Sequence, residues 1–200
     1  MTAVAHPLSP PSPWIERWSH LVRPGGEVLD VACGAGRHLQ WFARRGHPVC
    51  GLDQDIGAAQ ALSGAQAQGS TQGFELIAAD LERGPWPLGS GAARRQFAAV
   101  VVTHYLWRPL MDDIVQSLAP GGVLLYETFA AGNETVGRPA RPDFLLQPGE
   151  LLQACQHLHV VAYEHGFVAT PQRYVQRIAA VRPALHTVTP AEIRGHVLSG

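Results

Sequence analysis

The stretch that decides the fold spans residues 28–37 and reads Val-Leu-Asp-Val-Ala-Cys-Gly-Ala-Gly-Arg. Its first five residues predict a buried strand, and Gly34 and Gly36 predict a tight turn directly after it. Residues 37–45 then repeat apolar side chains at helical spacing and end at Gly46, a typical helix C-cap. A strand, a glycine turn and a helix in this order let a ligand approach the backbone closely, because glycine has no side chain to block it.

The same alternation of strands and helices continues along the chain. Apolar runs predict strands at 28–32, 49–52, 74–78, 97–103 and 123–128. Strands that are apolar on both sides predict a parallel sheet covered by helices on both faces. Two further strands, 160–168 and 174–181, have a connection too short for a parallel crossover. The sequence therefore predicts an α/β fold: a Rossmann-like, doubly wound, mostly parallel seven-stranded sheet with an antiparallel C-terminal hairpin.

The length of 200 residues and the apolar fraction of 46% fit a single domain. The N-terminus is rich in proline and serine, and Ser12 followed by Pro13 is typical of a helix start. The segments that we expect are a loose arm at 1–12, an N-terminal helix at 13–22, the core at 28–182 and a tail at 183–200.

Composition excludes several classes of function. All 15 basic residues are arginine, so a catalytic lysine and a Walker-type phosphate loop are excluded. The net charge of −1 argues against a protein that binds nucleic acid through its overall field. Cys33, Cys50 and Cys155 form no CxxC pair and the histidines show no HExxH spacing, so we expect no metal site. The chain shows neither a signal peptide nor a run of about 20 apolar residues, so we expect a cytoplasmic protein without a membrane span.

Three acids follow or end successive strands, where parallel sheets bind their ligands. Asp30, just before the glycine turn, suits a ligand that carries an ammonium group. Asp53 is placed to accept both hydroxyls of a ribose, and Asp80 to accept from an adenine amino group while Leu81 N–H donates to the ring. Leu39 replaces the third glycine of a dinucleotide motif, which favours a small cationic nucleoside over NAD. The alternative for each acid is an ordinary turn cap or strand-end residue.

On these residues the chain resembles the class I S-adenosylmethionine-dependent methyltransferases, over roughly residues 12–182. The family carries an acid-x-Gly-x-Gly-x-Gly motif, an acid at the end of the second strand and another after the third. The residues at these motif positions are Asp30, Ala32, Gly34, Gly36, Asp53 and Asp80. Pro-Gly-Gly in LAPGGVLLYETF is also typical. Ala32 departs from the motif by replacing its first glycine. The segment CGAGRH is similar to small bacterial enzymes of the tellurite-resistance type.

The resemblance implies methyl transfer from S-adenosyl-L-methionine, an in-line displacement that alignment and desolvation can catalyse without a dedicated acid or base. The cofactor-binding residues that we expect are Asp30, Ala32, Gly34, Gly36, Asp53, Asp80, Leu81 and Thr103.

Catalytic candidates follow the fourth strand. Tyr105 is placed to bring its ring near the sulfonium through a cation–π contact, and His104 to accept a proton from the substrate. The alternative is that both residues only pack at the start of the next helix. The segment lacks the Asn/Asp-Pro-Pro-Tyr/Phe run of enzymes that methylate nucleic-acid bases or glutamine.

The acceptor is expected to be a small molecule bound under the loop 130–147, because long loops in compact domains usually serve a site. Gly132 and Gly137 suggest a lid, and Arg138 and Arg141 suggest an anionic substrate. Open alternatives are an RNA or protein methyltransferase, a non-catalytic cofactor-binding protein, and a loop without a substrate role. Trp14 and Trp18 in the first helix either cover the cofactor or belong to the core.

Overall fold

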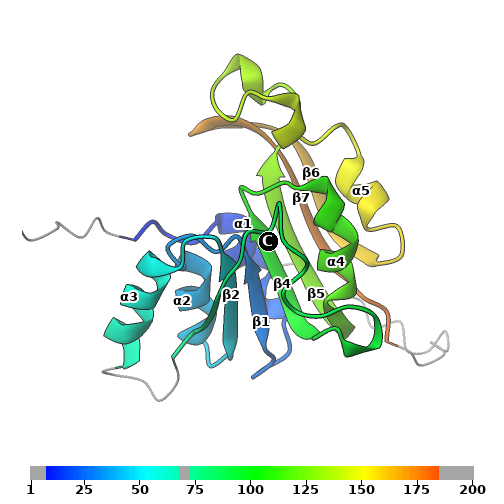
Figure 1. Ribbon diagram of the computed structural model, residues 1–200. Helices are drawn as coiled ribbons and strands as arrows, with labels where there is room; N and C mark the ends of the chain where they lie inside the picture. The colour runs from blue at the N-terminus through cyan, green and yellow to red at the C-terminus, as the bar shows by residue number, and fades with distance from the viewer. Residues whose placement is uncertain (1–7, 68–72, 185–200) are drawn as a thin grey trace, which may run out of the picture.

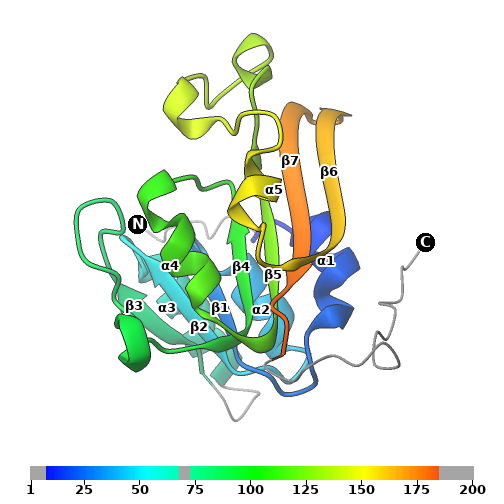
Figure 2. The same cartoon turned by 90° about the vertical axis from the view of Figure 1, so that its right-hand side faces the viewer.

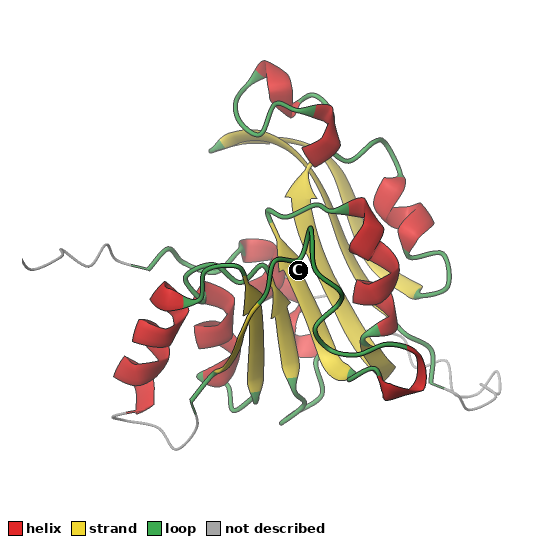
Figure 3. Cartoon of the chain, in the orientation of Figure 1, coloured by secondary structure: helices red, strands yellow, loops and turns green. Residues whose placement is uncertain are grey.

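The computed structural model describes residues 8–67 and 73–184, which form a twisted sheet with helices on both faces (Figure 1, Figure 3). The strands are β1 (Val28–Val31), β2 (Val49–Asp53), β3 (Glu75–Ala78), β4 (Phe97–Thr103), β5 (Leu118–Phe129), β6 (His159–Ala169) and β7 (Gln172–Val181). The helices are α1 (Pro13–Trp18), α2 (Arg37–Ala43), α3 (Gly57–Ala67), α4 (Met111–Gln116) and α5 (Glu150–Ala154).

The seven strands lie in the order β3-β2-β1-β4-β5-β7-β6. The five strands from β3 to β5 pair in parallel, whereas β7 pairs antiparallel with both β5 and β6. The predicted fold class is therefore confirmed, including the C-terminal hairpin. The chain order reverses direction between β1 and β4, and a crevice forms at such a point beyond the carboxyl ends of the strands.

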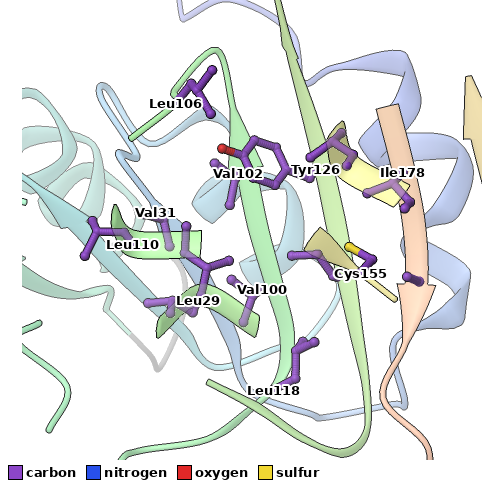
Figure 4. Packing of buried hydrophobic residues seen from close by; sticks show 14 of the residues in the cluster. Leu29, Val31, Val100, Val102, Leu106, Leu110, Leu118, Tyr126, Cys155 and Ile178 are labelled. Atoms are coloured by element: carbon purple, nitrogen blue, oxygen red, sulfur yellow. The ribbon is translucent and has the colours of Figure 1, made fainter. Parts of the chain in front are cut away.

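Two apolar layers hold the helices to the sheet. Leu29, Val100 and Tyr126 face α4 and α5, together with Cys155 of the segment that follows α5 (Figure 4). The other face packs against α1, α2 and α3, and Figure 2 shows α1 on the opposite side of the sheet from α4. Trp14 and Trp18 belong to this second layer, so of the two alternatives for these residues the structure supports the core.

The fifth strand begins earlier than the sequence predicts. Leu118 already pairs with Phe97, five residues before the predicted start at Val123. The Pro-Gly-Gly turn therefore lies within β5 rather than before it, and Gly121 N–H donates to the carbonyl of Arg182 at 2.9 Å. This partner is 61 residues away along the chain, so local turn signals do not reveal it.

The second half of the predicted loose arm is held in place. Ser12 is buried, caps α1, and donates its backbone N–H to Nε2 of His38 at 3.1 Å. Arg37 donates to the carbonyl of Pro10 at 3.3 Å. Residues 8–12, which we call the strap, are therefore packed against the domain, because a buried polar cap needs hydrogen-bond partners. The predicted arm residues 1–7 and tail residues 185–200 lie outside the described residues. In the part of the chain that the structure describes, no helix is long and apolar enough to cross a membrane.

The packing of β2 against α2 leaves no room for a side chain at Gly51. A Cβ there would lie 2.7 Å from Leu39, 2.9 Å from Cys33 and 2.9 Å from Leu76. We predict that Gly51→Ala lowers the free energy of unfolding by about 1–3 kcal/mol, the usual cost of overpacking a core. The matched control is Gly64→Ala in α3, where a Cβ meets nothing within 4 Å. This variant should gain about 0.5–1 kcal/mol. Urea unfolding measures both, and equal effects of the two substitutions would contradict the packing argument.

Candidate functional site

The turn after β1 places three alternate small residues in the left-handed region of backbone conformation. Ala32 has φ +55°, Gly34 φ +53° and Gly36 φ +83°. Alanine adopts this region only at a cost, whereas glycine does so freely. A Cβ at Gly34 would meet nothing within 4 Å, while one at Gly36 would lie 3.4 Å from Ala59 of α3. Gly34 therefore borders open space, and Gly36 serves the packing of helices.

Asp53 joins this turn to the end of β2. Its Oδ2 accepts from Gly34 N–H at 2.8 Å, and its Oδ1 accepts from Asp55 N–H at 3.0 Å. An ionised carboxylate offers about four lone-pair positions, so two remain for a ligand.

A cavity of about 350 Å³ opens beside Asp53, and we call it the carboxylate cavity. It is lined by Ala32, Asp53, Asp80, Leu81 and Tyr105, among others. Asp80 is fixed there because its Oδ1 accepts from the N–H groups of the next residues, Glu82 and Arg83.

A second cavity, of about 240 Å³, lies on the other side of Ala32 under the strap, and we call it the glycine-turn cavity. Its lining includes Leu8, Ser9, Ala32, Gly34, Arg37, Thr103 and His104. A third cavity, of about 270 Å³, lies under the loop 130–147, and we call it the aromatic cavity. Its lining includes Glu82, His104, Tyr105, Leu106, Phe129, Pro139 and Phe144.

The three cavities share walls, and the segment directly after β4 contributes to all of them. His104 lines the glycine-turn and aromatic cavities, and Tyr105 lines the carboxylate and aromatic cavities. The structure thus brings together eight of the predicted site residues: Ala32, Gly34, Asp53, Asp80, Leu81, Thr103, His104 and Tyr105. Asp30 and Gly36 line none of the three cavities.

His104 is held in a neutral form. Its Nε2 accepts from Arg173 Nη1 at 3.2 Å, and a guanidinium only donates, so the ring proton lies on Nδ1. Burial and the charge of Arg37 lower the pKa of His104. Its backbone is strained at φ +56°, and its N–H donates to the carbonyl of Glu127 at 2.9 Å.

Tyr105 presents a polar atom without a partner. Its hydroxyl is buried and makes no hydrogen bond within the described ranges, while burial raises its pKa. Its carbonyl accepts from the hydroxyl of Tyr126 at 2.9 Å, which fixes the backbone at this point. A ligand that donates or accepts at the Tyr105 hydroxyl would remove the cost of an unsatisfied polar group.

Asp30 is buried beneath the turn rather than exposed in a cavity. It is 1% exposed, and neither carboxyl oxygen has a hydrogen-bond donor in the described part of the chain. His38 Nδ1 lies 3.8 Å from its Oδ2. Burial raises the pKa of Asp30 to about 8 and lowers the pKa of His38 to about 3. Both groups are therefore uncharged at neutral pH, and direct contact of Asp30 with a ligand would require the turn to move.

The sequence analysis missed Glu127, which is fully buried at the end of β5. Its Oε1 accepts from Ser12 Oγ at 3.1 Å, and its Oε2 lies 2.6 Å from Arg177 Nε. Its Oε1 is also 3.8 Å from His104 Nε2. An acid in an otherwise apolar strand is a local signal, but its partners are up to 115 residues away, so the sequence does not identify them.

The loop 130–147 is anchored at two places. Asn133 is buried, accepts from Tyr174 N–H and donates to the carbonyl of Pro139. Arg108 donates to the carbonyls of Asp143 and Leu145 and makes a bidentate pair with Glu150.

Two expectations about this loop, the lid and the anionic substrate, stay predictions. Gly132 packs against the hairpin, because a Cβ there would lie 3.0 Å from the ring of Tyr174. Arg141 pairs with Asp143 at 2.9 Å on an exposed surface, and it lies outside the aromatic cavity.

The burial of Asp30 predicts a pH dependence of stability. The folded chain binds a proton at Asp30 up to about pH 8, whereas the unfolded chain releases it near pH 4. The contribution of this group to stability is therefore full below about pH 4 and is lost as the pH rises toward 8. We predict that Asp30→Asn loses less stability than the parent protein between pH 5 and 8. Urea unfolding at several pH values tests this, and parallel stability curves for the two proteins would contradict it.

Comparison with known proteins matches one part of the chain to a family. Residues 28–122 match a family of methyltransferase domains. A curated relative, the malonyl-[acyl-carrier protein] O-methyltransferase of Serratia marcescens, is 30% identical over 111 residues. The match covers 55% of this chain and 41% of the relative, so it spans about two fifths of the relative's length.

Solved structures share the fold at lower identity. TehB from Haemophilus influenzae superimposes with a TM-score of 0.66 at 16% identity, over 82% of this chain and 59% of that protein. The 1,6-didemethyltoxoflavin-N1-methyltransferase of Burkholderia thailandensis, solved with S-adenosylhomocysteine bound, gives 0.59 at 17% identity, over 85% and 76%. At these identities the likeness shows the fold, so the tellurite-resistance subgroup remains a prediction. The matched segment carries β1 to β4 and the glycine turn, together with Asp30, Asp53 and Asp80. Residues 28–122 are therefore matched as a methyltransferase domain, and the fold is shared with a methyltransferase solved with S-adenosylhomocysteine.

Proposed function

We propose that this protein transfers a methyl group from S-adenosyl-L-methionine to a small molecule that binds in the aromatic cavity. The observation that carries the proposal is the meeting of three cavities at His104 and Tyr105. Two of these cavities flank the glycine turn, and the third lies under the loop 130–147. A cofactor and an acceptor that occupy them would meet at this one segment, as a direct transfer requires.

The residues present fit the cofactor. The carboxylate cavity supplies Asp53, with lone pairs still available, for a ribose, and Asp80 with Leu81 for an adenine. Asp30 does not fit the role of a direct partner for the ammonium group, because it is buried and uncharged at neutral pH. We assign it to the support of the turn instead.

When bound, the cofactor supplies an electrophilic methyl group. The chain's own residues orient the acceptor and exclude water from it: Leu106, Phe129 and Phe144 form apolar walls, and the Tyr105 ring separates the aromatic cavity from the carboxylate cavity. Exclusion of water strengthens electrostatic contacts inside the site and prevents hydrolysis.

His104 contributes as a neutral imidazole. Arg173 occupies its Nε2, and the nearby charge of Arg37 disfavours the imidazolium. Proton abstraction at Nε2 therefore requires the bond to Arg173 to open. We propose that His104 positions the acceptor, and that the acceptor loses its proton to this ring only if that bond breaks.

Two observations favour a small acceptor over a nucleic acid. The net charge of −1 gives the chain no overall positive field for phosphate contacts. The similar proteins named above are methyltransferases of malonyl-[acyl-carrier protein] and of 1,6-didemethyltoxoflavin, and neither name refers to a nucleic acid. An RNA or protein acceptor is the alternative that the assays below distinguish. The cytoplasmic location remains a prediction.

The ribose assignment predicts a loss of cofactor affinity. Asp53→Ala removes the carboxylate that lines the carboxylate cavity, so S-adenosylhomocysteine should bind more weakly by about 1–3 kcal/mol. Isothermal titration calorimetry measures the change. Asp55→Ala, which removes an exposed neighbouring acid, is the control and should bind as the parent does. Equal affinities of the Asp53→Ala variant and the parent protein would refute the assignment.

The acceptor assignment predicts a separation of kinetic constants. Phe144 lines the aromatic cavity but neither of the other two, so Phe144→Ala should raise KM for the acceptor about tenfold and leave S-adenosylhomocysteine affinity unchanged. The acceptor is found first, by chromatographic detection of S-adenosylhomocysteine with panels of phenols, amines, carboxylates, RNA and protein.

Turnover only with RNA or protein would overturn the small-molecule proposal. Cofactor binding without turnover on any acceptor would favour the non-catalytic alternative.

A further inference from the structure

Arg37 is a charged side chain that has no role toward a ligand in the proposed function. It is the first residue of α2 and lines the glycine-turn cavity. Among the residues that line this cavity it is the only arginine, and the cavity's histidine, His104, is neutral. The guanidinium is thus the one fixed positive charge in the wall of this cavity.

No acid neutralises Arg37 in the described part of the chain. No carboxylate lies within 4 Å of its guanidinium, and its one hydrogen bond is the 3.3 Å contact with Pro10 of the strap. Asp30 is protonated at neutral pH, and Glu127 is already paired with Arg177. Burial lowers the pKa of Arg37, so the charge is partly desolvated. A partly desolvated charge without a partner costs free energy that a bound anion would offset.

The two cavities beside the glycine turn share Ala32, so one ligand can extend from one into the other. If the nucleoside end occupies the carboxylate cavity, as the proposed function holds, the amino-acid tail of the cofactor enters the glycine-turn cavity. That tail carries a carboxylate. We propose that Arg37 binds the carboxylate of the cofactor's amino-acid tail and makes the site select for ligands that carry it. This inference rests on the proposed placement of the nucleoside.

A guanidinium suits this role because its planar donors match the two oxygens of a carboxylate. Four of the five donors of Arg37 make no hydrogen bond in the described ranges. The strap carbonyl of Pro10 orients the group from outside, while Leu8 and Ser9 cover the cavity. Arg37 does not line the aromatic cavity, so an anionic acceptor is not its partner.

The test compares two probes that differ only in the carboxylate. S-adenosylhomocysteine carries it, and S-adenosyl-3-thiopropylamine, the decarboxylated analogue, lacks it. Isothermal titration calorimetry of the full chain should show S-adenosylhomocysteine binding at least about tenfold more tightly, as expected for a charge-assisted contact. Arg37→Gln should remove this preference by weakening only S-adenosylhomocysteine.

Three control variants test whether the preference for the carboxylate depends on Arg37. Arg45→Gln removes the same charge from the exposed end of the same segment, where Arg45 stacks on Trp41, and should keep the preference. Asp53→Ala should weaken both probes equally, because both carry the ribose. Arg37→Lys keeps the charge without the planar fork and should keep part of the preference.

The outcomes separate the two proposals. Equal affinity of the parent protein for the two probes would overturn the role of Arg37, and this measurement needs no variant that must fold. An equal loss of both probes in Arg37→Gln would likewise overturn it, because the residue would then only support the turn. Failure of the parent protein to bind either probe would overturn the cofactor placement itself. A preference for S-adenosylhomocysteine that disappears only in Arg37→Gln supports the proposal.

Discussion

A carboxylate without access to water needs partners, and the Glu127 carboxylate finds them in two segments that are distant in the sequence. Ser12 of the strap donates to it and Arg177 of β7 pairs with it. The main-chain carbonyl of Glu127 accepts from the backbone N–H of His104. Removing one partner of such a buried group is costly, because the remaining charge stays desolvated. The strap, the hairpin and the segment after β4 are therefore held together at the carboxyl end of the sheet, where the three cavities meet.

This arrangement links four of the buried polar residues, which are Asp30, His38, Ser12 and Glu127. Ser12 donates to Glu127, and His38 lies 3.8 Å from Asp30. Neutral His38 accepts from the Ser12 backbone, so the two ends of this group are linked through the strap. The glycine turn is thereby supported from below, while its open side borders the cavities.

The sequence predicts the parts of this structure that depend on local pattern. The predicted range of β4, residues 97–103, is confirmed, because a run of apolar residues is a local signal. Ser12 and Pro13 begin α1 as expected, because helix capping is also local. The contacts of the strap and the role of Glu127 are not predicted from the sequence. Their hydrogen-bond partners lie 26 to 115 residues away along the chain, beyond the reach of local pattern. The acids that end or follow β2 and β3 were found, whereas the burial of Asp30 depends on how α1 and α2 close over it.

The anchoring of the loop 130–147 limits how an acceptor enters. Asn133 fastens one side of the loop to the hairpin, and Arg108 fastens the other through the carbonyls of Asp143 and Leu145. Asn133 also donates to the carbonyl of Pro139, so the stretch between the two anchors is tied down as well. An acceptor that entered the aromatic cavity would therefore pass a fixed rim rather than a swinging loop. A fixed rim would act as a sieve that selects molecules by size.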